Sequence, residues 1–133
     1  MVHYSLVAVV FAMLSLGGCA FPSEAIDNFD RSYRLYERAL RWQDYDLVLG
    51  FHKNEKDKLT EVSRKKLKKF RVSGYNVLFT TINADEKSAT QVVEVKYYHQ
   101  EYAVIRDITL TNKWEYDETK ERWELANPFP DFR

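Results

Sequence analysis

The chain has 133 residues, with twenty Lys and Arg against twenty Asp and Glu and a single cysteine. This length suits one small domain, and a net charge of zero excludes a general nucleic-acid binder, because such binding depends on an excess of Lys and Arg. One cysteine excludes an internal disulfide and a cysteine-cluster zinc site. The charges are unevenly placed, since residues 1–18 contain none of them.

An apolar run, LVAVVFAMLSL, covers residues 6–16. It is shorter than the about 20 residues that span a bilayer as a helix, and it matches the apolar region of a secretory signal peptide, about 7–15 residues long. The run leads into Leu16-Gly17-Gly18-Cys19, where small residues precede the only thiol of the chain. These residues resemble the lipobox of bacterial lipoproteins.

The resemblance implies that residues 1–18 are a signal peptide, that Cys19 becomes the lipidated N-terminus, and that residues 19–23 form a short spacer. Two or three acyl chains, palmitate among them, would give stable membrane anchoring. Ala20 follows the cysteine instead of Asp, which implies the outer membrane and its periplasmic face in a Gram-negative cell envelope. The alternative is an uncleaved anchor or an ordinary signal peptide with an incidental cysteine.

Three helices are predicted in the first half of the remaining chain. Apolar residues recur in steps of three and four, the spacing of one helix face, at Ile26, Phe29, Tyr33, Tyr36 and Leu40. Ser23 can cap the start of this helix, and Asp44 can cap a short second helix that ends near Phe51. A third helix is predicted over residues 57–70.

The second half of the chain alternates as β-strands do. Strands are predicted over residues 72–83 and 89–99, from Val104 to Trp114, and over residues 122–126, with polar turns between them. Tyr75, Val77 and Phe79 are expected to share one face of the first strand. Residues 24–133 are therefore predicted to form an α+β domain, with N-terminal helices packed on a curved, cone-like antiparallel meander of about four strands.

The order of these elements and several core positions carry a family resemblance. The pattern begins with Tyr36-x-x-Ala39-Leu40 and Asp44-Tyr45-Asp46 and ends with Trp114-x-Tyr116 and Trp123-x-Leu125. It resembles the nuclear transport factor 2-like (cystatin-like) superfamily. The resemblance implies a cone that binds a small molecule, packs against a partner, or carries acid–base chemistry on Asp, His and Tyr side chains lining it.

The strongest candidates for acid–base catalysis are Asp107 and His99, although a solvated surface position is the favoured interpretation for both. His52 is interpreted as a surface or capping histidine. The histidines have no metal-ligand spacing, and no glycine-rich phosphate loop occurs, so neither a metal nor a cofactor is predicted.

Four aromatic residues on the predicted sheet are the candidates for ligand binding: Tyr75, Phe79, Tyr97 and Trp114. Such residues either pack as core or line a pocket for an apolar or ring-containing ligand. Tyrosine hydroxyls would supply the polar contacts in that pocket.

A basic face is predicted on the third helix, because residues 53–71 carry nine bases and three acids. Its members are Arg64, Lys65, Lys66, Lys68 and Lys69. A solvated helix face is the simplest interpretation. The functional alternative is docking on anionic lipid or on an acidic envelope protein, since each Lys or Arg near a membrane contributes about 1 kcal/mol; nucleic acid is not an expected partner.

The sequence as a whole predicts a lipid-anchored envelope lipoprotein with a small non-catalytic domain. That domain would bind a small apolar or aromatic ligand or an envelope protein. The alternative is a small acid–base enzyme of the isomerase or cyclase kind that uses a pocket in the cone.

Overall fold

Helix α1 (Glu24–Arg41) begins the part of the chain that the computed structural model describes, which comprises residues 24–54 and 61–133. The three-and-four spacing buries Phe29, Tyr36 and Leu40 on one side of this helix, as predicted. The predicted signal peptide, Cys19 and the spacer lie outside the described residues, and so does Ser23.

Helix α2 (Tyr45–Phe51) begins after Asp44, whose carboxylate accepts a hydrogen bond from the Leu47 N–H at 3.3 Å. Helix α3 (Glu61–Leu67) ends three residues before the predicted limit. Phe70 instead starts the first strand, because its backbone pairs with His99. Residues 57–60 of the predicted third helix lie outside the described residues.

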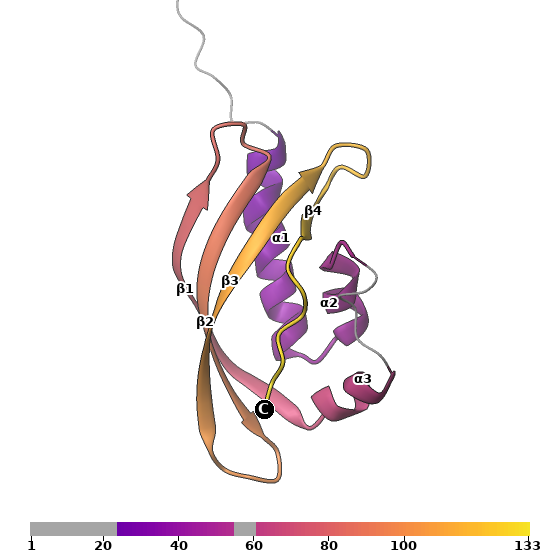
Figure 1. Cartoon of the computed structure of the whole chain (residues 1–133), viewed down its shortest axis with the longest axis vertical. Coiled ribbons are helices and arrows are strands. Elements are labelled where there is room, and N and C mark those ends of the chain that lie inside the picture. Colours follow the sequence, from indigo (N-terminus) through magenta and orange to yellow (C-terminus); the bar gives the residue numbers. More distant parts are fainter. Residues whose placement is uncertain (1–23, 55–60) are drawn as a thin grey trace, which may run out of the picture.

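Four antiparallel strands follow in the order β1-β2-β3-β4 (Figure 1). They are β1 (Phe70–Ile82), β2 (Ser88–His99), β3 (Ile105–Asp117) and β4 (Arg122–Leu125). The predicted α+β class, with helices first and a four-stranded meander after them, is confirmed. The sheet stays open and does not close into a barrel.

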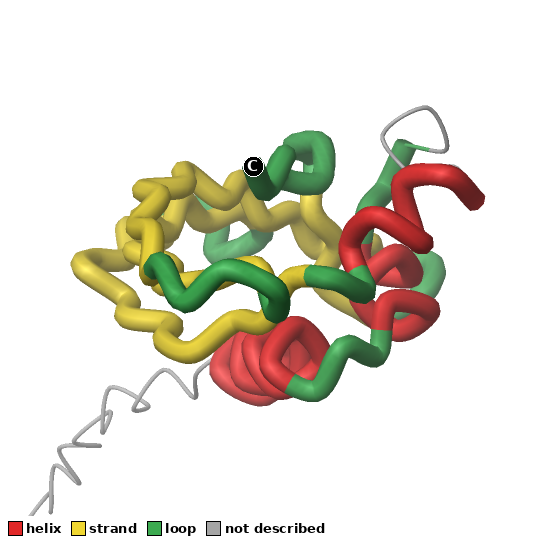
Figure 2. The backbone as a smooth tube through the Cα atoms, turned by 90° about the horizontal axis from the view of Figure 1, so that it is seen from below, coloured by secondary structure: helices red, strands yellow, loops and turns green. Residues whose placement is uncertain are grey.

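The sheet curves around its inner face, which we define as the face that packs against α1 and the C-terminal segment (Figure 2). The largest side chains buried there are Trp114 and Trp123, each 1% exposed. The Trp123 Nε1 donates to the Ala25 carbonyl at 2.6 Å and so joins β4 to the first turn of α1. Phe129 and Phe132 from the C-terminal segment complete this core.

A β-bulge changes the direction of side chains halfway along β1. Val77 pairs with Val93, whereas Phe79 pairs with Val92, so one residue of β1 is inserted between these pairs. Phe79 consequently lies on the outer face and is 57% exposed. The prediction that Phe79 shares a face with Tyr75 and Val77 is therefore wrong, because simple alternation ignores the bulge.

Candidate functional site

The other three predicted ligand-binding aromatics lie on the inner face and are packed against neighbouring rings. Tyr75, Tyr97 and Trp114 are 8%, 5% and 1% exposed. The ring of Trp114 lies 5.7 Å from that of Tyr36, and the ring of Tyr97 lies 4.7 Å from that of Phe132. Their contacts are those of a packed core, in which side chains of the chain itself occupy the inner face.

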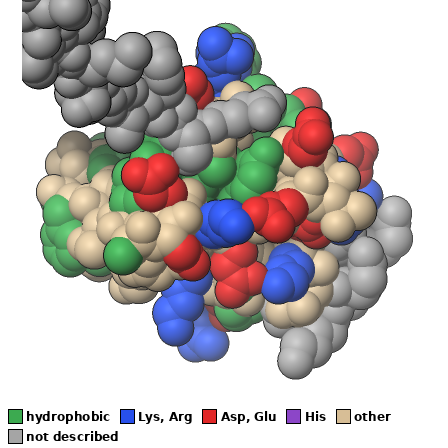
Figure 3. Space-filling view, turned by 90° about the horizontal axis from the view of Figure 1, so that it is seen from above, with side chains coloured by type: hydrophobic (Ala, Val, Ile, Leu, Met, Phe, Trp, Pro, Cys, Tyr) green, Lys and Arg blue, Asp and Glu red, His purple; other side chains and the backbone are tan. Residues whose placement is uncertain are grey.

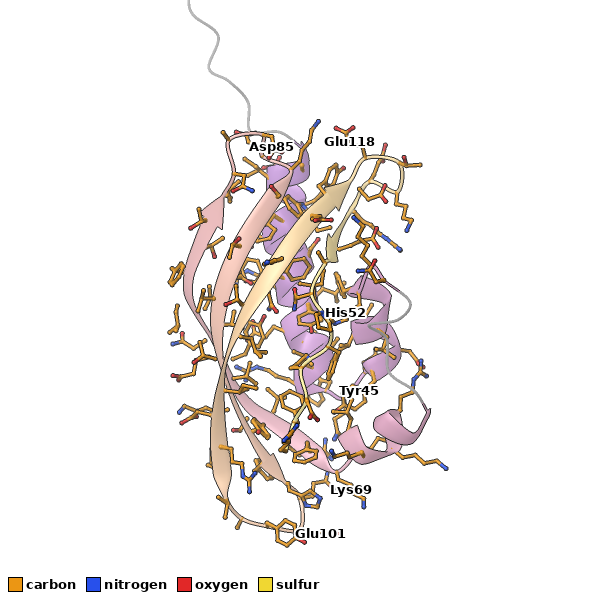
Figure 4. All side chains as sticks on the ribbon, in the orientation of Figure 1. Tyr45, His52, Lys69, Asp85, Glu101 and Glu118 are labelled. Atoms are coloured by element: carbon orange, nitrogen blue, oxygen red, sulfur yellow. The ribbon has the colours of Figure 1, made fainter. Side chains whose placement is uncertain are left out.

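His52 is the C-cap residue of α2, as the sequence allows, but the predicted surface position is wrong because its side chain is buried. It is 1% exposed and points toward the interior between the sheet and helices α1 and α2 (Figure 4). Its Nε2 lies 3.3 Å from the Tyr36 hydroxyl, and its Nδ1 lies 2.9 Å from the Asn127 carbonyl. The backbone bridge between His52 and Leu125 turns this residue inward, and nothing in the local sequence signals a contact so distant along the chain.

Further buried polar groups continue from His52 across the inner face. The Asn127 amide donates to Asn112 Oδ1 at 3.3 Å, and the Asn112 amide donates to the Tyr75 hydroxyl at 3.3 Å. Burial raises the pKa of Tyr36 and of Tyr75 above the ordinary tyrosine value. Both phenols therefore stay protonated near neutral pH and serve as hydrogen-bonding groups of the core.

The two candidate acid–base residues are not brought together. Asp107 lies exposed on the outer face, where it forms an ion pair with Lys96 at 2.9 Å. His99 lies at the end of β2, beside the inner-face residue Phe70, and its Nδ1 accepts the Glu101 N–H at 3.1 Å. A catalytic dyad needs both groups within reach of one substrate atom, and opposite faces of a sheet do not provide this.

His99 lines a hollow of about 410 Å³ at the end of the sheet where β2 turns into β3. The residues that line it are Phe70, His99, Tyr102, Val104, Arg106 and Arg133. Tyr102 and Val104 are 64% and 59% exposed. Most of this lining is apolar, and its charged members are both arginines.

The predicted basic face lies close to this hollow, at the end of α1 opposite its first turn. Gln43, two residues after α1, donates its side-chain N–H groups to the carbonyls of Lys68 and Phe70 at 3.0 and 2.7 Å. Lys65, Lys66, Lys68 and Lys69 are exposed. Arg64 is half-buried and pairs with Asp46 at 2.8 Å. Lys69 and Glu101 mark this end of the molecule in Figure 4.

Residues 24–54 and 61–133 contain neither a metal-binding cluster nor a membrane-spanning helix. No group of three or more His, Cys, Asp and Glu side chains there could hold a metal ion. No helix in the same ranges is long and apolar enough to cross a membrane.

No protein-family model matches the chain, and no curated protein matches it. Two solved structures resemble its fold. The solution structure of a SEC-C motif containing protein from Rhodopseudomonas palustris is 14% identical, covers 80% of this chain and 79% of its own, and gives a TM-score of 0.61. The crystal structure of a SEC-C motif containing protein from Psychrobacter arcticus is 8% identical, covers 77% of this chain and 62% of its own, and gives a TM-score of 0.56.

These structural neighbours contradict the family resemblance that was inferred from the sequence. Both are described as SEC-C motif containing proteins and neither as a nuclear transport factor 2-like protein or a lipoprotein, so that resemblance is wrong. Tyr36, Leu40, Trp114 and Trp123, which carried it, are buried core residues. Such positions are apolar in any fold that packs helices on a meander, so they do not separate one family from another.

Proposed function

We propose that the chain is a cell-envelope protein held at a membrane by lipid on Cys19, with residues 24–133 acting as a non-catalytic binding domain. The observation that carries this proposal is the apolar run that ends in Leu16-Gly17-Gly18-Cys19. Cys19 is the only thiol of the chain and stands five residues before α1 begins. In a Gram-negative cell the domain would face the periplasm from the outer membrane.

Packing on the inner face supports a binding domain over an acid–base enzyme. Phe29, Tyr36 and Trp114 pack edge to face there, with ring centroids 5.7 and 6.0 Å from Trp114. The buried His52 and Tyr36 side chains bond to each other beneath these rings. Polar groups held in this way satisfy one another in the core, whereas a general acid or base must reach a substrate proton.

The basic face is the surface we assign to a partner, and its position favours an acidic envelope protein over the anchoring membrane. Five residues, 19–23, reach at most about 17 Å. Helix α1 has 18 residues and is about 27 Å long. Because Lys68 is joined to the far end of that helix through Gln43, a domain that stands with α1 upright on a tether at Glu24 holds its basic face away from the bilayer.

Metabolic labelling with a radioactive palmitate tests the anchor. We expect the wild-type chain to take up label and to lose the mass of residues 1–18. Cys19→Ala should remove the label and leave the precursor unprocessed, because no other thiol can carry a thioether. Ser15→Ala is the matched control inside the apolar run and should be labelled normally. Label retained by Cys19→Ala would disprove the anchor.

A further inference from the structure

The two edges of the sheet differ, and we propose that the open edge, β1, pairs with the same edge of a second copy of the chain. The other edge, β4, has only four residues. Leu125 at its end forms a parallel bridge with His52, and the Leu125 carbonyl accepts the Lys53 N–H at 2.9 Å. Strand β1 has 13 residues and is the outermost strand on the opposite side of the sheet (Figure 1). This inference goes beyond the proposed function and does not rest on it.

The backbone of β1 presents hydrogen-bonding groups that β2 does not use. The Asn83 N–H donates to the Ser88 carbonyl of β2 at 2.9 Å. Because the backbone groups of an antiparallel pair face the partner strand at every second residue, those of Thr81 face β2, whereas those of Thr80 and Ile82 face away from it. Neither Thr80 nor Ile82 has a backbone hydrogen bond outside the ladder within residues 24–54 and 61–133. Their N–H and C=O groups are available to another strand.

The side chains along this edge are uncharged, and several are apolar and exposed. Residues 72–84 contain no Asp, Glu, Lys, Arg or Pro. Leu78, Phe79 and Ile82 are 49%, 57% and 40% exposed. Proteins usually protect an edge strand from pairing with lysine, proline or a β-bulge. The bulge before Phe79 interrupts the regular edge, so the stretch open to pairing is residues 79–83.

This stretch is complementary to itself. A two-fold axis at Thr81 places Thr80 of each copy opposite Ile82 of the other, where their outward groups form four hydrogen bonds between the copies. The paired stretch is five residues, or about 17 Å, long, and Asp85 of each copy lies beyond opposite ends of it. Like charges are therefore kept about two Debye lengths apart. Because β4 is short and bridged, each copy offers one open edge, and the assembly closes at two copies.

Cysteine crosslinking of the full chain in a mild non-ionic detergent tests the pairing. Every variant also carries Cys19→Ala, so the introduced cysteine is the only thiol and no result depends on lipidation. Thr81→Cys should form a disulfide-linked dimer on oxidation, because the axis places the two Thr81 Cα atoms about 4.5 Å apart. Thr111→Cys, exposed on the outer face of β3, is the matched control and should stay monomeric. Any association through residues 1–18 is common to both variants.

Sedimentation equilibrium of the same Cys19→Ala chain measures the dimer dissociation constant. Thr80→Pro should raise it about thirtyfold, because each copy loses one outward N–H and each lost hydrogen bond contributes a factor of about five. Thr80→Ala is its matched control, since it loses only the hydroxyl that accepts the Gln91 amide and keeps the N–H. Thr81→Lys should raise the dissociation constant about fivefold, because it sets two ammonium groups opposite each other, whereas Thr111→Lys should not change it.

Three results would overturn the inference. They are a chain that stays monomeric, including one whose edge takes up only a strand of another protein; equal crosslinking of Thr81→Cys and Thr111→Cys; and equal dissociation constants for Thr81→Lys and Thr111→Lys. Circular dichroism checks that each variant is folded. Thr81→Lys keeps every backbone donor of β1, so the test does not depend on the folding of Thr80→Pro.

Discussion

The two buried tryptophans offer a matched test of hydrogen bonding in the core. Trp114 and Trp123 are each 1% exposed. The Trp123 Nε1 donates to the Ala25 carbonyl at 2.6 Å, whereas the Trp114 Nε1 has no hydrogen-bond partner among the residues that the structure describes. Replacing each indole by phenylalanine should therefore have different effects on stability.

The size of the difference follows from the hydrogen bonds, because both substitutions remove the same atoms. Trp123→Phe loses a hydrogen bond whose net contribution is about 1 kcal/mol. Trp114→Phe removes a buried unpaired donor, whose desolvation costs about 1–3 kcal/mol. We expect Trp123→Phe to lower the free energy of unfolding by about 2–4 kcal/mol more than Trp114→Phe does.

Urea denaturation followed by far-ultraviolet circular dichroism measures both losses, provided that the slope of free energy against urea is the same in the two variants. Trp42→Phe is the control, because Trp42 is 78% exposed and its replacement should change the free energy of unfolding by no more than about 0.5 kcal/mol. Equal losses at the two buried positions, or a larger loss at Trp114, would refute the reasoning and show that the Trp114 N–H is paired.

Two further predictions concern pH and charge. Burial raises the pKa of Tyr36 and Tyr75 in the folded state above the unfolded value of about 10. The stability that the two protonated tyrosines contribute is therefore present below about pH 10 and is lost as the pH rises through their folded pKa. The free energy of unfolding, measured by urea denaturation at pH values between about 8 and 11, should show this fall, and it should fall less steeply with pH in Tyr75→Phe. An equal slope in the variant and the wild type would contradict the assignment. Separately, binding of poly-L-glutamate to the full chain should weaken about tenfold or more when four lysines are changed to Glu; an unchanged affinity would count against the acidic partner. These lysines are Lys65, Lys66, Lys68 and Lys69.

Periodicity was sufficient to predict the elements of the fold. The spacing from Ile26 to Leu40 gave α1, and the Asp44 cap placed the start of α2, because both signals lie within one or two helical turns. The order of helices and strands then limited the architecture to helices on a meander. Phe70 was misassigned to a helix because its strand partner, His99, lies 29 residues away along the chain.

The candidate site was less accessible to sequence reasoning for the same reason. His52 is buried by its bridge to Leu125 and its bond to Asn127, contacts that no local pattern encodes. The bulge near Phe79 inverts the alternation of β1, and bulges leave little signal in a single sequence. His99 was identified as polar and near a turn, but its neighbours Arg106 and Arg133 meet it only through the turn of β2 into β3 and the returning C-terminal segment.

The charges of the domain are separated along the axis of α1, which bears on how it would stand on a membrane. Asp85 and Glu118 lie in the two turns beside the start of that helix, whereas Lys69 lies at the opposite end (Figure 4). Figure 3 looks onto the first end and shows acidic side chains with some Lys and Arg among them. The field of an anionic surface decays within a Debye length of about 8 Å. Helix α1 is about 27 Å long, so a domain that stands with this helix upright on the membrane holds the lysines beyond its far end more than three such lengths away from the surface. These lysines are therefore available to bind a partner of opposite charge.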